Sequence, residues 1–139
     1  MLATDFHQNS RLAFAYAAAL AGHFESNLTT LHAFEFGPYS QTIEVLDHVP
    51  SKERKNAESL LRNFVLEAGH PDVFSEVVVV EGFVTSAIIK ALSLRSVDLL
   101  VIGTEGVHRG VDHLLLGSNT EALMLGSPCL TLAVGHNSR

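Results

Sequence analysis

Short apolar, β-rich runs alternate with helix-like segments along the whole chain, and this alternation constrains the fold more than any other feature. The predicted strands are a very short one at Met1–Thr4 and longer ones at Leu28–Phe34, Phe74–Val80, Val97–Ile102 and Cys129–Val134. The predicted helices are Arg11–Phe24, Ser51–Ala68, Val84–Leu94 and Ser118–Leu125. Strands that alternate with helices indicate right-handed crossovers. The sequence therefore predicts an α/β protein with a doubly wound parallel sheet and helices on both faces, a Rossmann-like fold.

Local patterns indicate how individual elements begin, end and pack. The most regular helical pattern is Ser51–Ala68, which Gly69 follows as a stop signal. Before the first helix, Asn9 and Ser10 are the candidate N-cap residues. The four consecutive valines at 77–80 predict a strand that is covered on both faces. Residues 35–50 lack periodicity, and a loop of that length in a small domain is often functional or mobile.

The composition is that of one globular domain, residues 1–139. Hydrophobic residues make up 47% of the chain and charged residues 17%, and no apolar run approaches the roughly 20 residues that span a bilayer. The net charge is −6, and the lysines and arginines are scattered, which argues against a nucleic-acid partner. Cys129 is the only cysteine and no signal peptide is recognisable, so we expect a cytoplasmic protein without an intramolecular disulfide.

One segment near the carboxyl end carries the pattern of an anion-binding site. The apolar run Leu99–Ile102 ends at Gly103 and Gly106, and a second small pair, Gly117-Ser118, opens the last helix. Glycine lets the backbone approach a phosphate closely, and the unpaired N–H groups at the start of a helix point towards it. In doubly wound sheets the ligand lies beyond the carboxyl ends of the strands, so polar ends of other strands are expected to complete the pocket.

Three blocks of the sequence form a recognisable set: LATDFHQNSRLAFAYA at the start, TLHA at the end of the second strand, and DLLVIGTEG followed by HLLLGSNTEALMLGSPCLTLAV at the end. These blocks resemble the universal stress protein domain. With the Glu81-Gly82 pair after the valine strand, they cover nearly the whole chain in the family's order. Nucleotide-binding members carry the pattern Gly, two residues, Gly, nine residues, Gly, then Ser or Thr. This sequence has ten residues between Gly106 and Gly117, one more than that pattern.

The resemblance implies a fold, a ligand and an assembly. The sheet is expected to have five strands in the order 3-2-1-4-5, and the protein is expected to form a homodimer largely through its last strand. ATP, accompanied by Mg²⁺, is the implied regulatory ligand. By position in the family pattern, Asp5 with its neighbour Thr4 is assigned to the nucleoside, and the backbone of Ala33 to adenine. The residues assigned to the phosphate side are Gly103, Gly106, Gly117, Ser118 and the adjacent Asn119.

Each assigned residue also has a purely structural interpretation. The glycines after the fourth strand can simply allow a tight turn. Asp5 can stabilise a turn by accepting hydrogen bonds from nearby backbone N–H groups. Ser118 and Glu121 form an S-x-x-E capping box, which accounts for Ser118 without a ligand. The two kinds of role are compatible, because a phosphate can use the helix N–H groups that the cap leaves unpaired.

Glu105 keeps two other functions open. A carboxylate beside a polyphosphate is repulsive, so it must point outward, recruit a divalent cation or mark a site that no longer takes ATP. In the last case the protein is a nucleotide-free dimeric scaffold. The other function left open is that of a slow hydrolase of an adenine nucleotide, although the sequence offers no general base beside the γ-phosphate. The eight histidines show no metal-ligand spacing, and Cys129 is expected to be a buried, inert thiol.

Overall fold

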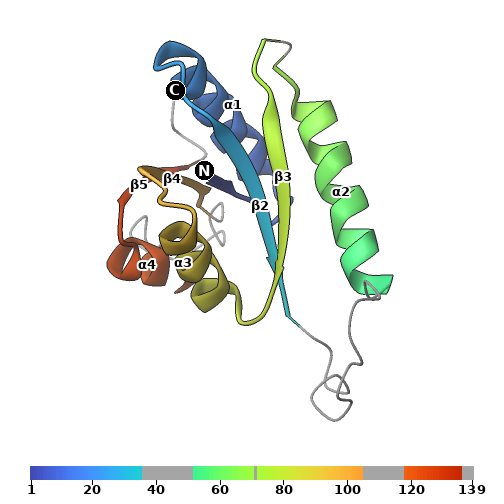
Figure 1. Ribbon diagram of the computed structural model, residues 1–139, viewed down its shortest axis with the longest axis vertical. Helices are drawn as coiled ribbons and strands as arrows, with labels where there is room; N and C mark the ends of the chain where they lie inside the picture. The colour runs from blue at the N-terminus through green and yellow to red at the C-terminus, as the bar shows by residue number, and fades with distance from the viewer. Residues whose placement is uncertain (36–51, 71, 105–117, 136–139) are drawn as a thin grey trace, which may run out of the picture.

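The computed structural model describes residues 1–35, 52–70, 72–104 and 118–135 (Figure 1). Every predicted strand and helix is present, with small differences at the ends. In chain order the elements are β1 (Leu2–Ala3), α1 (Gln8–His23), β2 (Leu28–Phe34), α2 (Lys52–Ala68), β3 (Ser75–Glu81), α3 (Val84–Leu94), β4 (Leu99–Gly103), α4 (Ser118–Gly126) and β5 (Leu130–Val134). None of the described helices is both long and apolar enough to cross a membrane.

The strands form one five-stranded parallel sheet in the order β3-β2-β1-β4-β5, which confirms the predicted fold class and strand order. The chain moves outward from β1 to β3 and then crosses to β4 on the other side of β1 (Figure 1). The strand order therefore reverses between β1 and β4. In open α/β sheets this is where a crevice opens beyond the carboxyl ends of the strands.

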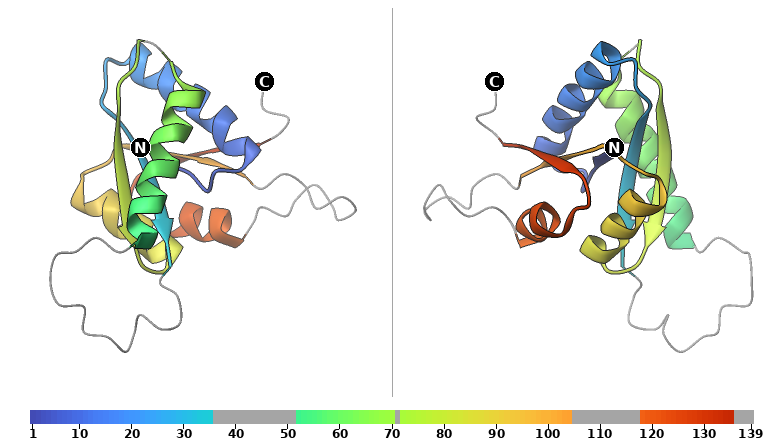
Figure 2. Two further views of the ribbon diagram at one scale, coloured as in Figure 1. Left: turned by 90° about the vertical axis from the view of Figure 1, so that its right-hand side faces the viewer. Right: turned by 60° about the vertical axis from the view of Figure 1, so that its left-hand side comes forward.

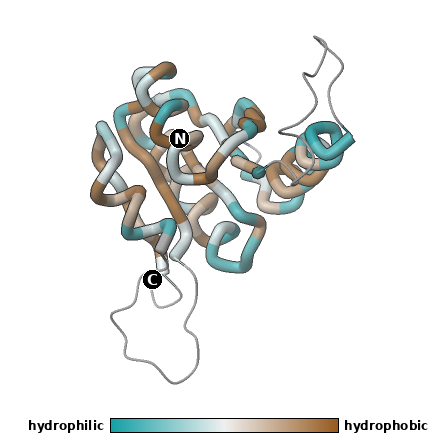
Figure 3. Tube along the Cα trace, turned by 90° about the horizontal axis from the view of Figure 1, so that it is seen from below, coloured by the Kyte–Doolittle hydropathy of each residue, from teal (hydrophilic) through white to brown (hydrophobic). Residues whose placement is uncertain are grey.

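The helices cover the sheet in two pairs (Figure 2). α1 and α2 pack on one face, where Phe14 and Leu61 are fully buried. α3 and α4 pack on the other, where Leu92 and Leu123 are buried. Figure 3 shows hydrophobic residues along the interior strands, whereas the helices carry both kinds of residue. The two cores together hold the carboxyl ends of the central strands in fixed positions.

The valine strand β3 lies at an edge of the sheet, and both of its faces are nevertheless covered, as predicted. Val77 and Val79 pack in the core beneath α1 and α2, whereas Val78 and Val80 pack in the core beneath α3. At the rim, Arg54 of α2 donates from Nη2 to the carbonyl oxygen of Val79 at 3.1 Å. The continuous apolar run thus reflects two covered faces and not a central place in the sheet.

The predicted N-cap of the first helix is wrong. Asn9 and Ser10 lie buried inside the first turn of α1, and the residue at the N-cap position is His7, whose side chain makes no capping hydrogen bond. The physical reason is that a turn held by Asp5, farther upstream, leads the chain into the helix. Oδ1 of Asp5 accepts a hydrogen bond from the His7 N–H at 3.0 Å and another from the Ser10 hydroxyl at 2.8 Å.

Candidate functional site

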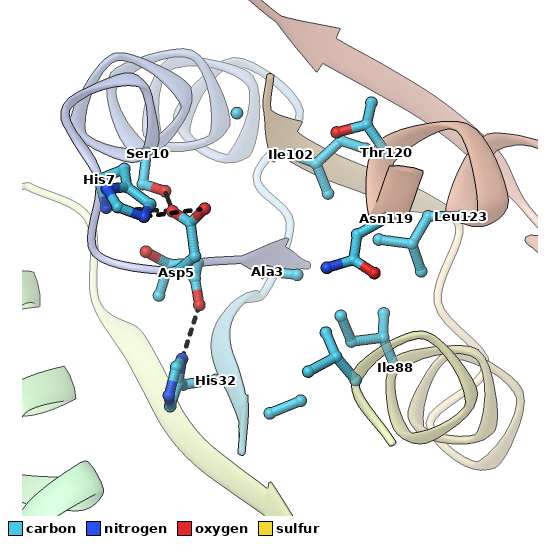
Figure 4. A pocket seen from close by; sticks show the side chains of 14 residues that line it. Ala3, Asp5, His7, Ser10, His32, Ile88, Ile102, Asn119, Thr120 and Leu123 are labelled. Atoms are coloured by element: carbon cyan, nitrogen blue, oxygen red, sulfur yellow. Dashed lines mark hydrogen bonds and ion pairs between the residues drawn. The ribbon is translucent and has the colours of Figure 1, made fainter. Parts of the chain in front are cut away.

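A pocket of about 300 Å³ opens at the carboxyl ends of the central strands, where the strand order reverses (Figure 4). This is the lower end of the range typical of small-molecule sites. Strands β1, β2 and β4 end at it, the first turn of α1 borders it, and α3 and α4 close it on the far side. The predicted residues that it brings together are Thr4, Asp5, Ala33, Gly103 and Asn119.

The remaining predicted residues cannot be placed in the pocket. Gly106 and Gly117 lie outside the described residues, as does Glu105. Ser118 begins α4, but its side chain is also outside the described part of the chain. The phosphate assignment of these residues, and the capping box of Ser118 with Glu121, therefore stay predictions.

Asp5 has one oxygen occupied and one available. Oδ1 accepts two hydrogen bonds, from the His7 N–H and the Ser10 hydroxyl. Oδ2 has no hydrogen bond to a described residue, and its nearest recorded partner is Nε2 of His7 at 4.0 Å. Half of the Asp5 side chain is exposed. The turn-forming interpretation of Asp5 is thus correct for one oxygen, and the other remains able to accept a hydrogen bond from a ligand.

Thr4 supports the turn that carries Asp5. Its hydroxyl oxygen accepts a hydrogen bond from the Phe6 N–H at 3.0 Å, and its carbonyl oxygen lies 2.8 Å from Nδ1 of His32. Because a carbonyl oxygen only accepts, Nδ1 is the donor in that bond. Phe6 has a positive φ of 67°, an uncommon conformation for an aromatic residue. Its ring packs against His32 and Phe64, with centroids 4.4 and 5.9 Å away, and this packing holds the turn.

Ala33 presents backbone groups at the pocket because β1 leaves the sheet early. The register of β1 with β2 ends at Ala3 and Leu31, and the last bond runs from the Thr4 N–H to the Leu31 carbonyl oxygen. In a parallel ladder, alternate residues direct their peptide groups to the same neighbour. The N–H and C=O of Ala33 therefore face the space beyond the end of β1, which is where the pocket lies.

Gly103 is required by packing. A Cβ atom on Gly103 would lie 2.8 Å from the carbonyl carbon of Asn9 and 2.9 Å from the backbone nitrogen of Ser10. The Asn9 side chain reinforces this close approach, since its Nδ2 donates to the carbonyl oxygen of Thr104. These contacts favour the structural interpretation of this glycine, although Gly103 also lines the pocket.

An apolar wall faces Asp5 across the pocket. Its side chains are Val84 and Ile88 from α3, Ile102 from β4 and Leu123 from α4 (Figure 4). The Thr85 hydroxyl donates to Oδ1 of the lining residue Asn119 at 3.4 Å and joins the first turns of α3 and α4. One apolar side and one polar side suit a ligand with a flat ring and a hydroxylated part.

Sequence reasoning did not find nine of the residues that line the pocket. Those that it missed are Ala3, His7, Ser10, His32, Val84, Ile88, Ile102, Thr120 and Leu123. The apolar ones lie in strands or recur at helical intervals, and they are indistinguishable in sequence from core residues. Among the described lining residues there is no lysine or arginine, and in the described part of the chain no three His, Cys, Asp or Glu side chains could hold a metal ion together.

Comparisons with known proteins agree with this geometry. The Universal stress protein family matches residues 1–135. A universal stress protein of Staphylococcus haemolyticus is 30% identical over 137 residues, covering 96% of this chain and 82% of that protein. The hypothetical protein MJ0577 has a similar structure, with a TM-score of 0.72, 23% identity, and coverage of 99% of this chain and 96% of that one. The structure of a universal stress protein in complex with cAMP has a TM-score of 0.68 and 24% identity, and the match covers 96% of this chain and 93% of that one.

The fold and the pocket define a doubly wound α/β protein with a pocket at the reversal of strand order. Within that class, the family match extends over almost the entire chain. The chain belongs to the universal stress protein family.

Proposed function

We propose that this chain binds an adenine nucleotide, ATP, as a regulatory ligand in a homodimer. The observation that carries the proposal is the arrangement of the pocket. An available carboxylate oxygen of Asp5 faces an apolar wall from α3 and α4 across about 300 Å³. The related structure that holds cAMP, itself an adenine nucleotide, supports the choice of base.

In the proposed complex the adenine ring packs on Val84, Ile88 and Leu123 and meets the backbone of Ala33. The ribose lies at Asp5, whose Oδ2 accepts a hydrogen bond from a hydroxyl group. The triphosphate extends towards the start of α4, where helix N–H groups favour an anion. The residues proposed for that end are Gly103, Asn119, Gly106, Gly117 and Ser118.

Mg²⁺ is proposed to arrive with the nucleotide. The described residues contain no cluster of ligands for a metal ion, and Asp5 already uses one oxygen within the protein. Mg²⁺ commonly keeps several waters and binds through the phosphates of its nucleotide. The chain's described residues thus fit a metal that is held by the ligand, and they do not form a metal cage of their own.

A regulatory ligand fits the described pocket better than a substrate. Phosphoryl transfer relies on cations that stabilise charge on the transferred group, and the described lining contains no lysine or arginine. The homodimer is proposed to form at β5, an edge strand whose Leu130 is exposed. An apolar edge strand is a ready surface for pairing with a second copy.

The test is calorimetric titration of the protein with ATP and Mg²⁺, repeated on Asp5→Asn. The amide oxygen of the variant can keep the hydrogen bonds from His7 and Ser10, so the amide nitrogen replaces Oδ2 and can no longer accept from a hydroxyl. We expect ATP to bind about 10- to 100-fold more weakly to the variant. The exposed Asp72, changed to Asn, is the matched control and should leave affinity unchanged.

Absence of heat and of a thermal shift with millimolar ATP in the unaltered protein would refute nucleotide binding. That result would favour the nucleotide-free dimeric scaffold. Binding with equal affinity to Asp5→Asn would instead remove Asp5 from the site.

A further inference from the structure

We infer that His7 and Asp5 form a two-point clamp for the vicinal 2′- and 3′-hydroxyl groups of the ribose. In this arrangement His7 and Asp5 together determine specificity for ribonucleotides over deoxyribonucleotides. The inference rests on the proposed function, because it concerns the sugar of the ligand proposed for the same pocket.

Asp5 cannot hold the diol with one carboxylate oxygen for each hydroxyl group. A carboxylate often binds a diol with both of its oxygens, but Oδ1 of Asp5 already accepts from the His7 N–H and the Ser10 hydroxyl at 3.0 and 2.8 Å. Ser10 is 2% exposed, so its hydroxyl stays on the protein side of the carboxylate. Only Oδ2 is left to accept from the diol, and a second polar group beside it would give each hydroxyl its own partner.

His7 supplies that partner. Its Nε2 lies 4.0 Å from Oδ2 of Asp5, longer than a hydrogen bond, and both residues line the pocket (Figure 4). The two oxygens of a vicinal cis-diol are closer together than this gap, so each can approach one of the two protein atoms. An imidazole nitrogen either donates to a hydroxyl or accepts from it, and a hydroxyl can do both. The clamp therefore requires no particular charge on His7.

The backbone of His7 is fixed on both sides. Its N–H donates to Oδ1 of Asp5, and its carbonyl oxygen accepts from the Ser10 N–H at 2.9 Å. The His7 side chain is 71% exposed and lines the pocket, so it lies at the rim. A sugar hydroxyl of a bound ligand could contact it there. The clamp is thus built on the same hydrogen-bonded turn that positions Asp5.

Helix formation does not account for the His7 side chain. At the N-cap position Ser, Thr, Asp or Asn would accept a backbone hydrogen bond, whereas the His7 ring makes no capping contact. Its only recorded side-chain interaction with a described residue is the long approach to Oδ2 of Asp5. A role towards a ligand explains why its free nitrogen lies beside the available carboxylate oxygen.

The experiment titrates ATP, 2′-deoxy-ATP and 3′-deoxy-ATP into the full chain and into His7→Ala. The unaltered protein should bind the analogue that lacks the hydroxyl bound by Asp5 about 10- to 100-fold more weakly than ATP, as expected for a hydrogen bond to a charged group, and the other analogue about three- to tenfold more weakly. His7→Ala should weaken ATP by a similar factor and bind one analogue as well as it binds ATP. It should still discriminate against the analogue that lacks the hydroxyl bound by Asp5. His23→Ala, at the other end of α1, is the matched control and should keep both ratios.

The outcomes separate the clamp from the proposed function. If ATP binds and His7→Ala keeps both wild-type ratios, the clamp is wrong and nucleotide binding stands. If folded wild-type protein binds none of the three nucleotides, the proposed function fails and the clamp fails with it. Circular dichroism of each variant confirms that the chain is folded before titration.

Discussion

Gly103 lies where β4 ends against the first turn of α1, with no room for a side chain. We predict that Gly103→Ala lowers the free energy of unfolding by about 1–3 kcal/mol, the usual range for overpacking a closely packed site. The added Cβ would press on backbone atoms of Asn9 and Ser10, and backbone cannot move aside as the end of a flexible side chain can. Urea unfolding followed by circular dichroism measures the change.

Gly22 provides the control for this prediction. It lies in α1, and among the described residues a Cβ there would meet the Val73 side chain alone, at an ordinary contact distance of 3.7 Å. Gly22→Ala should therefore raise stability by up to about 1 kcal/mol, because alanine is the better helix former. Equal stability of Gly103→Ala and the unaltered protein would show that Gly103 is not needed for packing, and would return it to the ligand interpretation.

Among the elements, β1 contributes far more to the fold than its length indicates. Only Leu2 and Ala3 are in the strand, yet it lies between β2 and β4 in the middle of the sheet. Leu2 is fully buried in the core beneath α1 and α2. We predict that Leu2→Ala lowers the free energy of unfolding by about 2–5 kcal/mol, through lost apolar burial and the cavity left behind. Chemical denaturation monitored by far-ultraviolet circular dichroism checks this.

An exposed leucine provides the control that shows whether the effect of Leu2→Ala comes from burial. Leu125 of α4 is 82% exposed, so Leu125→Ala should change stability by no more than about 0.5 kcal/mol. If Leu2→Ala were as mild as Leu125→Ala, the central place of β1 in the folded sheet would be in question.

Elements were predictable from the sequence because their patterns are local. Periodicity alone indicates α2 and the valine strand β3, and the alternation of strands and helices indicates a parallel sheet. The start of α1 was not predictable in the same way. Its first turn is held by Asp5, which lies outside the helix and accepts hydrogen bonds from His7 and Ser10, a contact that no local pattern indicates.

The candidate site was predictable where strands end and where α4 begins, at Asn119. Thr4, Asp5 and Ala33 meet because the carboxyl ends of parallel strands lie at one edge of the sheet. Val84 and Ile88 were missed because their part in the pocket depends on the rotation of α3, which its apolar period does not specify. The packing demand on Gly103 requires knowing which backbone crosses β4, and no local pattern carries that information.

At the scale of the whole molecule, the two edges of the sheet differ. β3 forms one edge, and there Arg54 of α2 donates to Val79 and pairs with Glu81 across 3.5 Å. β5 forms the other edge, and Leu130 at its start is 77% exposed. Charged side chains at a strand edge discourage pairing with another chain, whereas an apolar edge favours it. This asymmetry makes β5 the edge at which we propose that a second copy binds.

The proposed dimer leads to a final prediction, in which Leu130→Glu converts the protein to a monomer. A glutamate there would have to be desolvated, or would face its counterpart across the interface, and either effect opposes association. Because Leu130 is exposed in the single chain, the fold itself should be unaffected. Phe74→Glu is the matched control, since Phe74 is 88% exposed and precedes β3 at the opposite edge. Light scattering at micromolar concentration should give a dimeric mass for the unaltered protein and for Phe74→Glu, and a monomeric mass for Leu130→Glu. A monomeric mass for the unaltered protein, or a dimeric mass for Leu130→Glu, would show that β5 does not carry the assembly.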